Sequence, residues 1–98
     1  MRFLIRATLP SASANEALKS GAVPELLGNF VKTYKPESAW FTMRDGERTC
    51  YFVVDVNDAT DMPSINEPFW HVAGAKMEWT PVMSFDELQA GLKKHLGR

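Results

Sequence analysis

The sequence lacks several features that define large functional classes. It has one cysteine in 98 residues, Cys50, which excludes an intramolecular disulfide and fits a reducing compartment. No apolar stretch approaches the length of a membrane span. The N-terminal apolar run Phe3–Ile5 is interrupted by Arg6 and is too short for a secretory signal. We therefore expect a soluble cytoplasmic protein with no membrane partner.

An excess of one charge is also missing. The net charge is −1, and both signs are scattered along the chain, so nucleic acid is not an expected partner. The only histidines, His71 and His95, belong to no motif with metal-ligand spacing. No glycine-rich loop follows an expected strand, which argues against a nucleotide. We predict neither a metal nor a cofactor.

The residues that are present describe one globular domain over residues 1–98. Hydrophobic residues make up 45% of the chain, which is ordinary for a folded domain and argues against disorder. A chain of this length buries enough surface for one core. We find no internal repeat, low-complexity run or linker that would divide it.

The first third predicts a strand followed by an interrupted helix. Residues 2–9 alternate and are rich in apolar side chains, which indicates a strand. The sequence Ser13–Glu16 has the form of a capping box and should open a helix. Gly21 and Pro24 predict a break near residues 20–23. Helical spacing of apolar residues then resumes, and Lys35-Pro36 should end the second segment.

The middle of the chain predicts a β-hairpin. Residues 37–44 and 48–56 form two strands, and Asp45-Gly46 between them favours a two-residue type I′ turn. This turn fixes which residues face each other. The expected pairs are Arg44 with Glu47, Thr42 with Thr49, Phe41 with Cys50, Trp40 with Tyr51, and Ala39 with Phe52.

The last third predicts a short helix, a loop, a strand and a final helix. Residues 57–61 carry capping residues and early negative charge, and Pro68 should stop the helix that they open. Residues 68–75 are expected to form a loop and residues 76–83 a strand. A second capping box, Ser84–Glu87, opens the last helix. Its apolar side consists of Phe85, Leu88, Leu92 and Leu96.

This order, βαββαβ followed by a helix, predicts an α+β fold of the ferredoxin-like type. Right-handed crossovers give an antiparallel sheet in the strand order 4-1-3-2, with helices on one face. The helix-covered face should carry Phe3, Ile5, Ala7, Phe41, Met43, Cys50, Phe52, Val54, Met77 and Trp79. The other face should carry Leu4, Arg6, Thr8, Trp40, Thr42, Tyr51, Val53, Lys76, Glu78 and Thr80.

The order of elements and the segment GAKMEWTPVMSFDEL resemble small bacterial domains of the dimeric α+β barrel superfamily. More distantly, the chain resembles muconolactone isomerase in Asp55–Asp58, Pro68-Phe69 and Glu78–Pro81. The resemblance implies a homodimer in which two sheets pack face to face and leave a cleft. Members of this superfamily include isomerases, cofactor-free monooxygenases, haem-degrading enzymes and proteins without known activity. No catalytic signature of these enzymes matches, so the resemblance assigns no catalytic residue.

The second sheet face is too apolar for open solvent and too polar for a core, which suggests a dimer interface or a ligand surface. Arg6 could bind a carboxylate, with Trp40 and Tyr51 as aromatic walls, while His71 or Glu78 moves a proton. The structural alternatives are a cross-strand ion pair, aromatic packing and a loop histidine. Cys50 is better explained as a buried thiol than as a nucleophile.

Two functional hypotheses follow from these residues. In the first, a homodimer binds a small organic molecule and, by the resemblance, acts as an isomerase or a cofactor-free oxygenase. In the second, the same face serves only as the contact of a non-catalytic interaction module. Whether His71 and Glu78 point into one cavity distinguishes the two hypotheses. A site for proton transfer needs an acid–base side chain within reach of the bound molecule.

Overall fold

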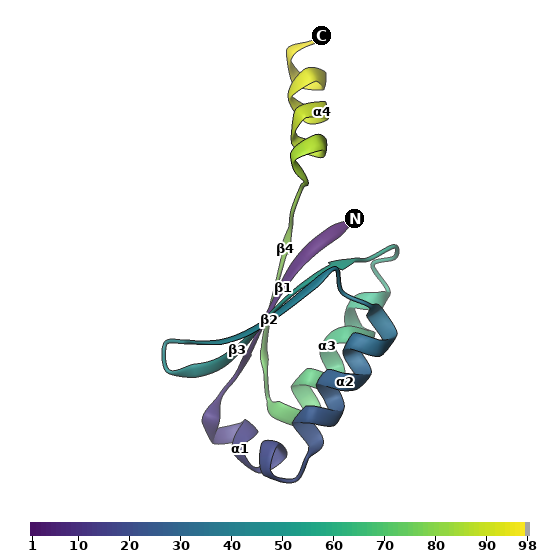
Figure 1. Cartoon of the computed structure of the whole chain (residues 1–98). Helices are drawn as coiled ribbons and strands as arrows, with labels where there is room; N and C mark the ends of the chain where they lie inside the picture. The colour runs from purple at the N-terminus through teal and green to yellow at the C-terminus, as the bar shows by residue number, and fades with distance from the viewer. Residues whose placement is uncertain (98) are drawn as a thin grey trace.

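The computed structural model describes residues 1–97 and contains one antiparallel sheet of four strands (Figure 1). The elements are β1 Arg2–Leu9, α1 Ser11–Lys19, α2 Ala22–Tyr34, β2 Ser38–Arg44, β3 Glu47–Asp55, α3 Asp61–Ala73, β4 Lys76–Pro81 and α4 Phe85–Leu96. The strands lie in the order β2-β3-β1-β4. The predicted α+β class, ferredoxin-like topology and strand order are therefore confirmed.

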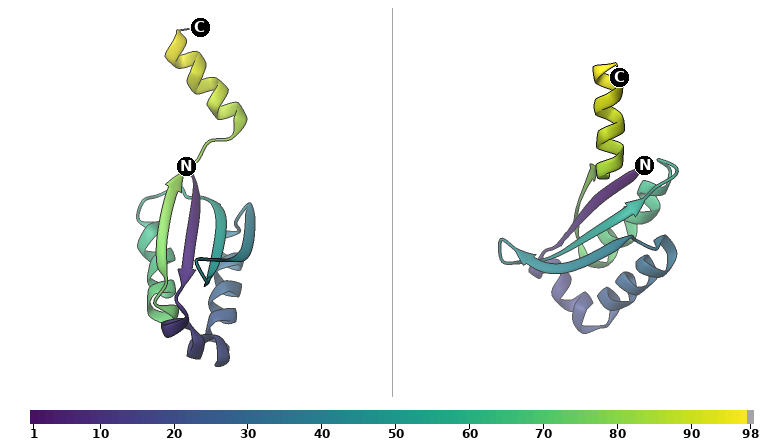
Figure 2. Two further views of the ribbon diagram at one scale, coloured as in Figure 1. Left: turned by 90° about the vertical axis from the view of Figure 1, so that its left-hand side faces the viewer. Right: turned by 45° about the horizontal axis from the view of Figure 1, so that its top comes forward.

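The domain has two layers. Helices α2 and α3 lie side by side over one face of the sheet, and α1 joins them at the end where β1 stops (Figure 2). No helix within residues 1–97 covers the opposite face, which we call the helix-free face. The two layers explain the alternation of the strands, because every second side chain meets the helices.

The core fills the space between the sheet and the three helices. Phe30 of α2, Phe52 of β3 and Phe69 of α3 meet there, with ring centroids 4.5, 5.5 and 6.2 Å apart. Phe52 is fully buried, as are Ile5 and other residues predicted for this face. The face assignment made from alternation is thus correct for the centre of the sheet.

The hairpin follows the predicted register residue for residue. All five expected cross-strand pairs between β2 and β3 are present. Both turn residues have positive φ, 53° at Asp45 and 76° at Gly46, as a type I′ turn requires. The tip of the hairpin extends beyond the helices (Figures 1 and 2). Phe41 and Met43 therefore remain 58% and 76% exposed, although they point to the helical side.

The first helical segment contains one confirmed and one wrong prediction. The expected break is present, since α1 ends at Lys19 and Gly21 adopts a φ of 89° before α2 begins. The prediction of a capping box at Ser13–Glu16 is wrong, because α1 already begins at Ser11. The hydroxyl of Ser13 instead donates to the carbonyl oxygen of Ala73 at 2.7 Å and so joins α1 to the end of α3.

The prediction that Pro68 ends the second helix is also wrong. Helix α3 continues through Pro68 to Ala73, so residues 68–73 are helical and not part of a loop. A proline inside a helix removes one backbone hydrogen bond. Burial offsets this cost here. The buried side of α3 starts at Ile65, and Phe69 and Ala73 extend it beyond Pro68.

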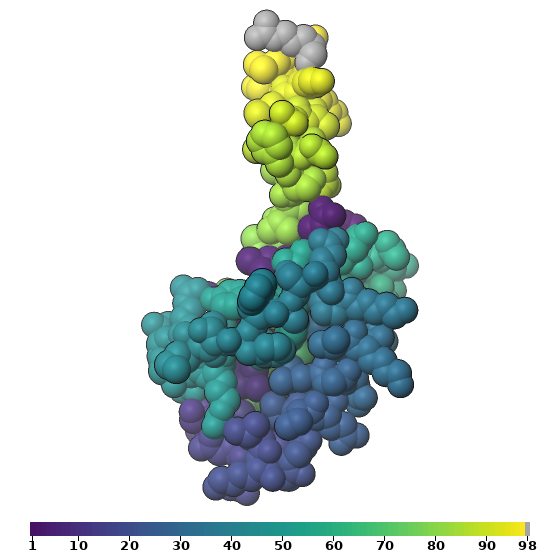
Figure 3. Space-filling view, in the orientation of Figure 1, coloured from purple at the N-terminus to yellow at the C-terminus, as the bar shows by residue number. Residues whose placement is uncertain are grey.

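Helix α4 leaves the domain and extends away from it (Figures 1 and 3). Its predicted capping box is present, since the Ser84 hydroxyl accepts from the Glu87 amide and the Glu87 carboxylate accepts from the Ser84 amide. None of its residues is buried. The radius of gyration is 15.7 Å, whereas a compact domain of this length has about 13 Å. The last helix thus makes the chain elongated.

Candidate functional site

Four of the five residues predicted for a site form one row across the helix-free face. Trp40 of β2 is paired with Tyr51 of β3, Tyr51 with Arg6 of β1, and Arg6 with Glu78 of β4. Directly paired residues on neighbouring strands have Cβ atoms about 5 Å apart. The order of the strands therefore places two aromatic rings, a guanidinium and a carboxylate in sequence across the sheet.

Arg6 is at the centre of this row. Its side chain is 22% exposed, and its Nη2 donates a hydrogen bond to Oε2 of Glu78. This hydrogen bond is the main cause that raises the pKa of Arg6 above its ordinary value. Its Nε is buried and has no hydrogen-bond partner within the described residues. Arg6 thus has one buried donor without a partner among the described residues, while Glu78 remains 61% exposed.

Tyr51 lies between two guanidinium groups. A hydrogen bond with Arg44 and then one with Arg6 lower the pKa of its hydroxyl below the ordinary value of 10.0. Arg44 was absent from the site predicted from the sequence. Alternation could have found it, because Arg44 follows Trp40 and Thr42 on the same face of β2.

The row is bordered by two further rows on the same face. One row is purely polar or charged and contains Thr42, Thr49, Thr8 and Lys76. The other contains Ser38, Val53, Leu4 and Thr80. Trp40 is 67% exposed at the edge strand, and it is the largest apolar side chain on this face. The face therefore combines the cationic side chains of Arg6, Arg44 and Lys76 with aromatic and aliphatic surface.

The fifth predicted residue, His71, is separated from the row. It lies on α3 instead of the expected loop, its side chain is 79% exposed, and its Nε2 is 2.9 Å from Oε2 of Glu67. Helix α3 covers one face of the sheet, whereas Glu78 pairs with Arg6 on the other. The structure therefore does not bring His71 and Glu78 into one cavity of a single chain.

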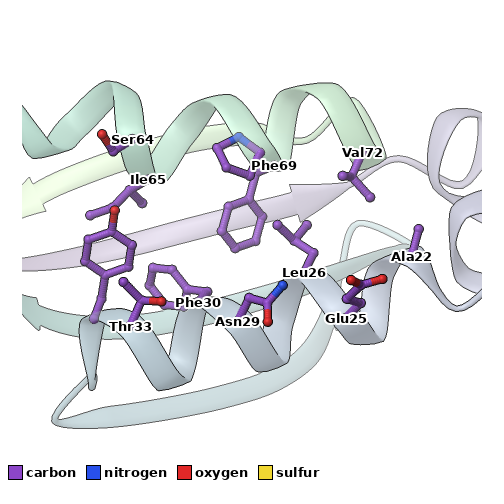
Figure 4. Close-up of a pocket in the computed structure, with 12 residues that line it drawn as sticks. Ala22, Glu25, Leu26, Asn29, Phe30, Thr33, Ser64, Ile65, Phe69 and Val72 are labelled. Atoms are coloured by element: carbon purple, nitrogen blue, oxygen red, sulfur yellow. The ribbon is translucent and has the colours of Figure 1, made fainter.

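A separate groove of about 440 Å³ lies between α2 and α3 (Figure 4). It is lined by Ala22, Glu25, Leu26, Asn29, Phe30, Thr33, Tyr34, Ser64, Ile65, Pro68, Phe69 and Val72. Aromatic and aliphatic side chains form its floor, and polar side chains such as Glu25 and Asn29 come from α2. None of the five predicted site residues lines it, so the sequence prediction missed this groove.

Two further kinds of reactive group, the thiol and clusters of metal ligands, can be assessed within residues 1–97. Cys50 is 4% exposed, and burial raises the pKa of its thiol to about 11. A thiol in this environment stays protonated near neutral pH and is a poor nucleophile. Within residues 1–97, no group of three or more His, Cys, Asp or Glu side chains could hold a metal ion. No helix in that range is long and apolar enough to cross a bilayer.

The fold and the row define a ferredoxin-like α+β domain with a mixed polar and aromatic sheet face. The chain belongs to the DUF3303 family, described as a domain of unknown function, whose model matches residues 1–96. The family thus covers nearly the whole chain, including α4. No curated protein matches the chain.

Proposed function

We propose that the chain forms a homodimer through its helix-free face and binds a small organic molecule there. Arg6 holds an anionic or carbonyl group of this molecule, and Trp40 and Tyr51 contact its apolar or aromatic part. The resemblance to dimeric α+β barrels, in which two sheets face each other, supports this arrangement. A second sheet would also cover Trp40, which a monomer leaves in water.

The observation that carries the proposal is the position of Arg6. Its Nε is buried and has no hydrogen-bond partner within residues 1–97, although the Glu78 carboxylate binds the Nη2 of the same side chain. A buried donor without a partner costs free energy, typically about 1–3 kcal/mol. A ligand oxygen could accept only from the part of the guanidinium that remains accessible, since the Arg6 side chain is 22% exposed. An arginine is also well suited to planar anionic groups such as carboxylates.

If the dimer is an enzyme, its chemistry is an isomerisation or a cofactor-free oxygenation. Glu78 would then accept the proton from the bound molecule, because it adjoins Arg6 on the same face. The role predicted for His71 would require a different surface, because His71 lies on the helical side. Tyr51 would stabilise negative charge through its hydroxyl, whose pKa is lowered by Arg44 and Arg6.

The alternative function is a non-catalytic dimeric interaction module. The ion pair between Arg6 and Glu78 favours it, because both charges already have a partner within the sheet. Two such sheets could pack face to face with no space for a ligand. The two functions differ in one measurable respect, since only the first requires a bound molecule that depends on Arg6.

Native mass spectrometry of the protein purified from cells tests the proposal. We expect a dimer that carries a small molecule. Arg6→Ala should lower the affinity for this molecule by at least about thirtyfold, which is the effect of removing a charged partner. Lys32→Ala removes an exposed positive charge on α2 and should change affinity less than about twofold. Equal binding by both variants would refute the site at Arg6.

Two further variants locate the molecule and the interface. Ser64→Trp fills the groove between α2 and α3 and should not displace the ligand. Displacement by Ser64→Trp, with Arg6→Ala still binding, would move the site to that groove. Trp40→Glu puts a charge on the helix-free face and should weaken the dimer. A dimer without any bound molecule would favour the interaction module.

A further inference from the structure

Helix α4 has an apolar side that remains largely exposed. This α4 stripe consists of Phe85, Leu88, Leu92 and Leu96, which are 71%, 40%, 51% and 58% exposed. The helix has 12 residues, and isolated helices shorter than about 12–15 residues are only marginally stable in water. An exposed stripe of this kind on a short helix indicates a contact surface.

The start of α4 is joined to the domain by an ion pair. The capping box of Ser84 and Glu87 closes its first turn, and Nη1 of Arg2 lies 2.5 Å from Oε1 of Glu87. Arg2 is the first residue of β1 and also binds Glu37 at 3.0 Å. The first turn of α4 therefore lies beside the start of β1, and the stripe extends from there.

The same chain contains an apolar groove that is open on one side. This hairpin groove has a volume of about 400 Å³ and lies where α1 and α2 leave the overhanging β-hairpin uncovered. Its apolar walls are Leu18, Val23, Leu27, Phe41 and Met43. Phe41 and Met43 lose most of the contacts that their inward direction would normally give them, and both are more than half exposed.

Helix α4 cannot reach the hairpin groove of its own chain. It starts beside the first residues of β1, since Pro81 pairs with Phe3 and Glu87 binds Arg2. The groove lies at the opposite end of β1, beside Leu9. Six residues of strand separate these ends by about 20 Å. Helix α4 also extends away from the sheet (Figures 1 and 3).

We propose that the α4 stripe of one chain packs into the hairpin groove of a second copy, and that the exchange is reciprocal. Twofold symmetry makes each chain give one helix and receive one. A helix of 12 residues is about 18 Å long, enough to cross the edge strand and reach α2. The proposal shares with the proposed function only the existence of a dimer, and the two interfaces use different residues.

The composition of the two grooves decides which one receives the helix. The groove between α2 and α3 is partly polar, since it carries Glu25, Asn29, Thr33 and Ser64. An apolar helix side packed there would bury these polar groups without hydrogen-bond partners, which is costly. The walls of the hairpin groove are apolar except for Arg48 and the two threonines. Pairing of α4 with α4 of the second copy would leave the hairpin groove exposed. Reciprocal exchange covers both apolar surfaces with one contact.

Thiol cross-linking between two single-cysteine proteins tests the exchange directly. Both carry Cys50→Ala, and one adds Leu88→Cys while the other adds Met43→Cys. With a short bifunctional maleimide, we expect a covalent dimer from the mixture and none from either protein alone. A covalent dimer from Leu88→Cys alone would overturn the proposal in favour of α4 pairing with α4. The absence of any covalent dimer would overturn it as well.

Matched charge variants on α4 give an independent measurement. Leu92→Glu places a charge in the stripe and should weaken the dimer by about thirtyfold or more in sedimentation, as expected for an interface anchor. Ala90→Glu adds the same charge on the opposite side of α4 and should change the dissociation constant less than about threefold. Both residues are exposed, so the domain should fold in both variants.

The outcomes separate this proposal from the proposed function. Equal dimer affinity in Leu92→Glu and Ala90→Glu overturns the exchange, while Trp40→Glu still reports on the sheet contact. Weakening by Leu92→Glu, with Trp40→Glu unaffected and ligand still bound through Arg6, would keep the exchange and remove the sheet contact. A wild-type chain that stays monomeric at micromolar concentration would overturn both dimer contacts.

Discussion

The two faces of β3 differ in what their side chains meet. Cys50, Phe52 and Val54 point to the helices and are at most 4% exposed, whereas Tyr51 and Val53 between them are only partly buried. The first set is held by packing. Tyr51 is instead surrounded by Arg6 and Arg44 and adjoins Trp40. A single strand of nine residues therefore serves both the core and the candidate site.

This difference shows how a small domain can separate stability from function. The helix-covered face can change little, because close-packed interiors respond to the loss of single methylene groups. The helix-free face is more exposed, apart from Thr49, and its exposed positions can vary in charge and shape with small effects on folding. Substitutions on the two faces should therefore have effects of very different size.

Phe52→Ala should give the largest effect. Phe52 is fully buried and contacts Phe30 and Phe69, and truncation of such a residue costs about 3–5 kcal/mol. Urea unfolding measures this loss. Trp40→Ala removes an aromatic ring from the other face and should change the free energy of unfolding of the monomer by less than about 0.5 kcal/mol. Equal losses would mean that the two faces do not differ as described.

Asn66→Ala tests a polar contact at the edge of the core. The Oδ1 atom of Asn66 accepts from the indole Nε1 of Trp79 at 2.8 Å, and Asn66 is 9% exposed. Its removal leaves a partly buried donor without a partner and should cost about 1–3 kcal/mol in thermal or urea unfolding. Asn29→Ala, at an exposed position of α2, is the control. A neutral Asn66→Ala would show that water replaces the amide.

Gly46→Val tests the turn that determines which residues lie on which face. A shift of the hairpin by one residue would exchange the two faces of β2. Gly46 has a φ of 76°, and a side chain in this region costs roughly 1–2 kcal/mol. Gly46→Asn should cost less, because asparagine tolerates positive φ. An unchanged urea midpoint for Gly46→Val would show that the strands, and not the turn, fix the register.

Most of the fold could be predicted from local patterns. Alternation in the strands and the Asp45-Gly46 turn were sufficient for the register of β2 and β3, and the break before Pro24 was visible from Gly21. These features depend on residues close in sequence. The row from Trp40 to Glu78 followed, because strand order and register place the four residues together.

The errors arose where distant contacts decide the local structure. Pro68 alone predicts the end of a helix, but Phe69 and Ala73 gain enough burial against the sheet to continue it. The prediction that His71 lies in a loop was wrong for the same reason, because His71 follows Pro68 on α3. Ser13 likewise binds the distant carbonyl of Ala73 and does not cap α1. The capping box of α4 was predicted correctly, but no local pattern shows what its apolar side contacts.

The smallest expected effect concerns the charge around Tyr51. In a Tyr34→Phe background, Tyr51 is the only tyrosine, and its phenolate absorbance reports its ionisation. Hydrogen bonds with Arg44 and then Arg6 lower the pKa of Tyr51. Arg44→Gln should therefore raise the midpoint toward 10, the ordinary value, and Arg6→Gln should raise it less.

The sign of the linked effect on stability follows from the lowered pKa. A hydroxyl that ionises more readily in the folded chain stabilises that chain above the ordinary pKa of tyrosine, and this contribution disappears as the pH falls through the folded value. The ionisation of Tyr51 should therefore make the free energies of unfolding of Arg44→Gln and its Tyr34→Phe parent differ only in alkaline solution. If Arg44→Gln leaves the Tyr51 midpoint unchanged, the guanidinium groups do not act on Tyr51, and the two faces of β3 differ in burial alone.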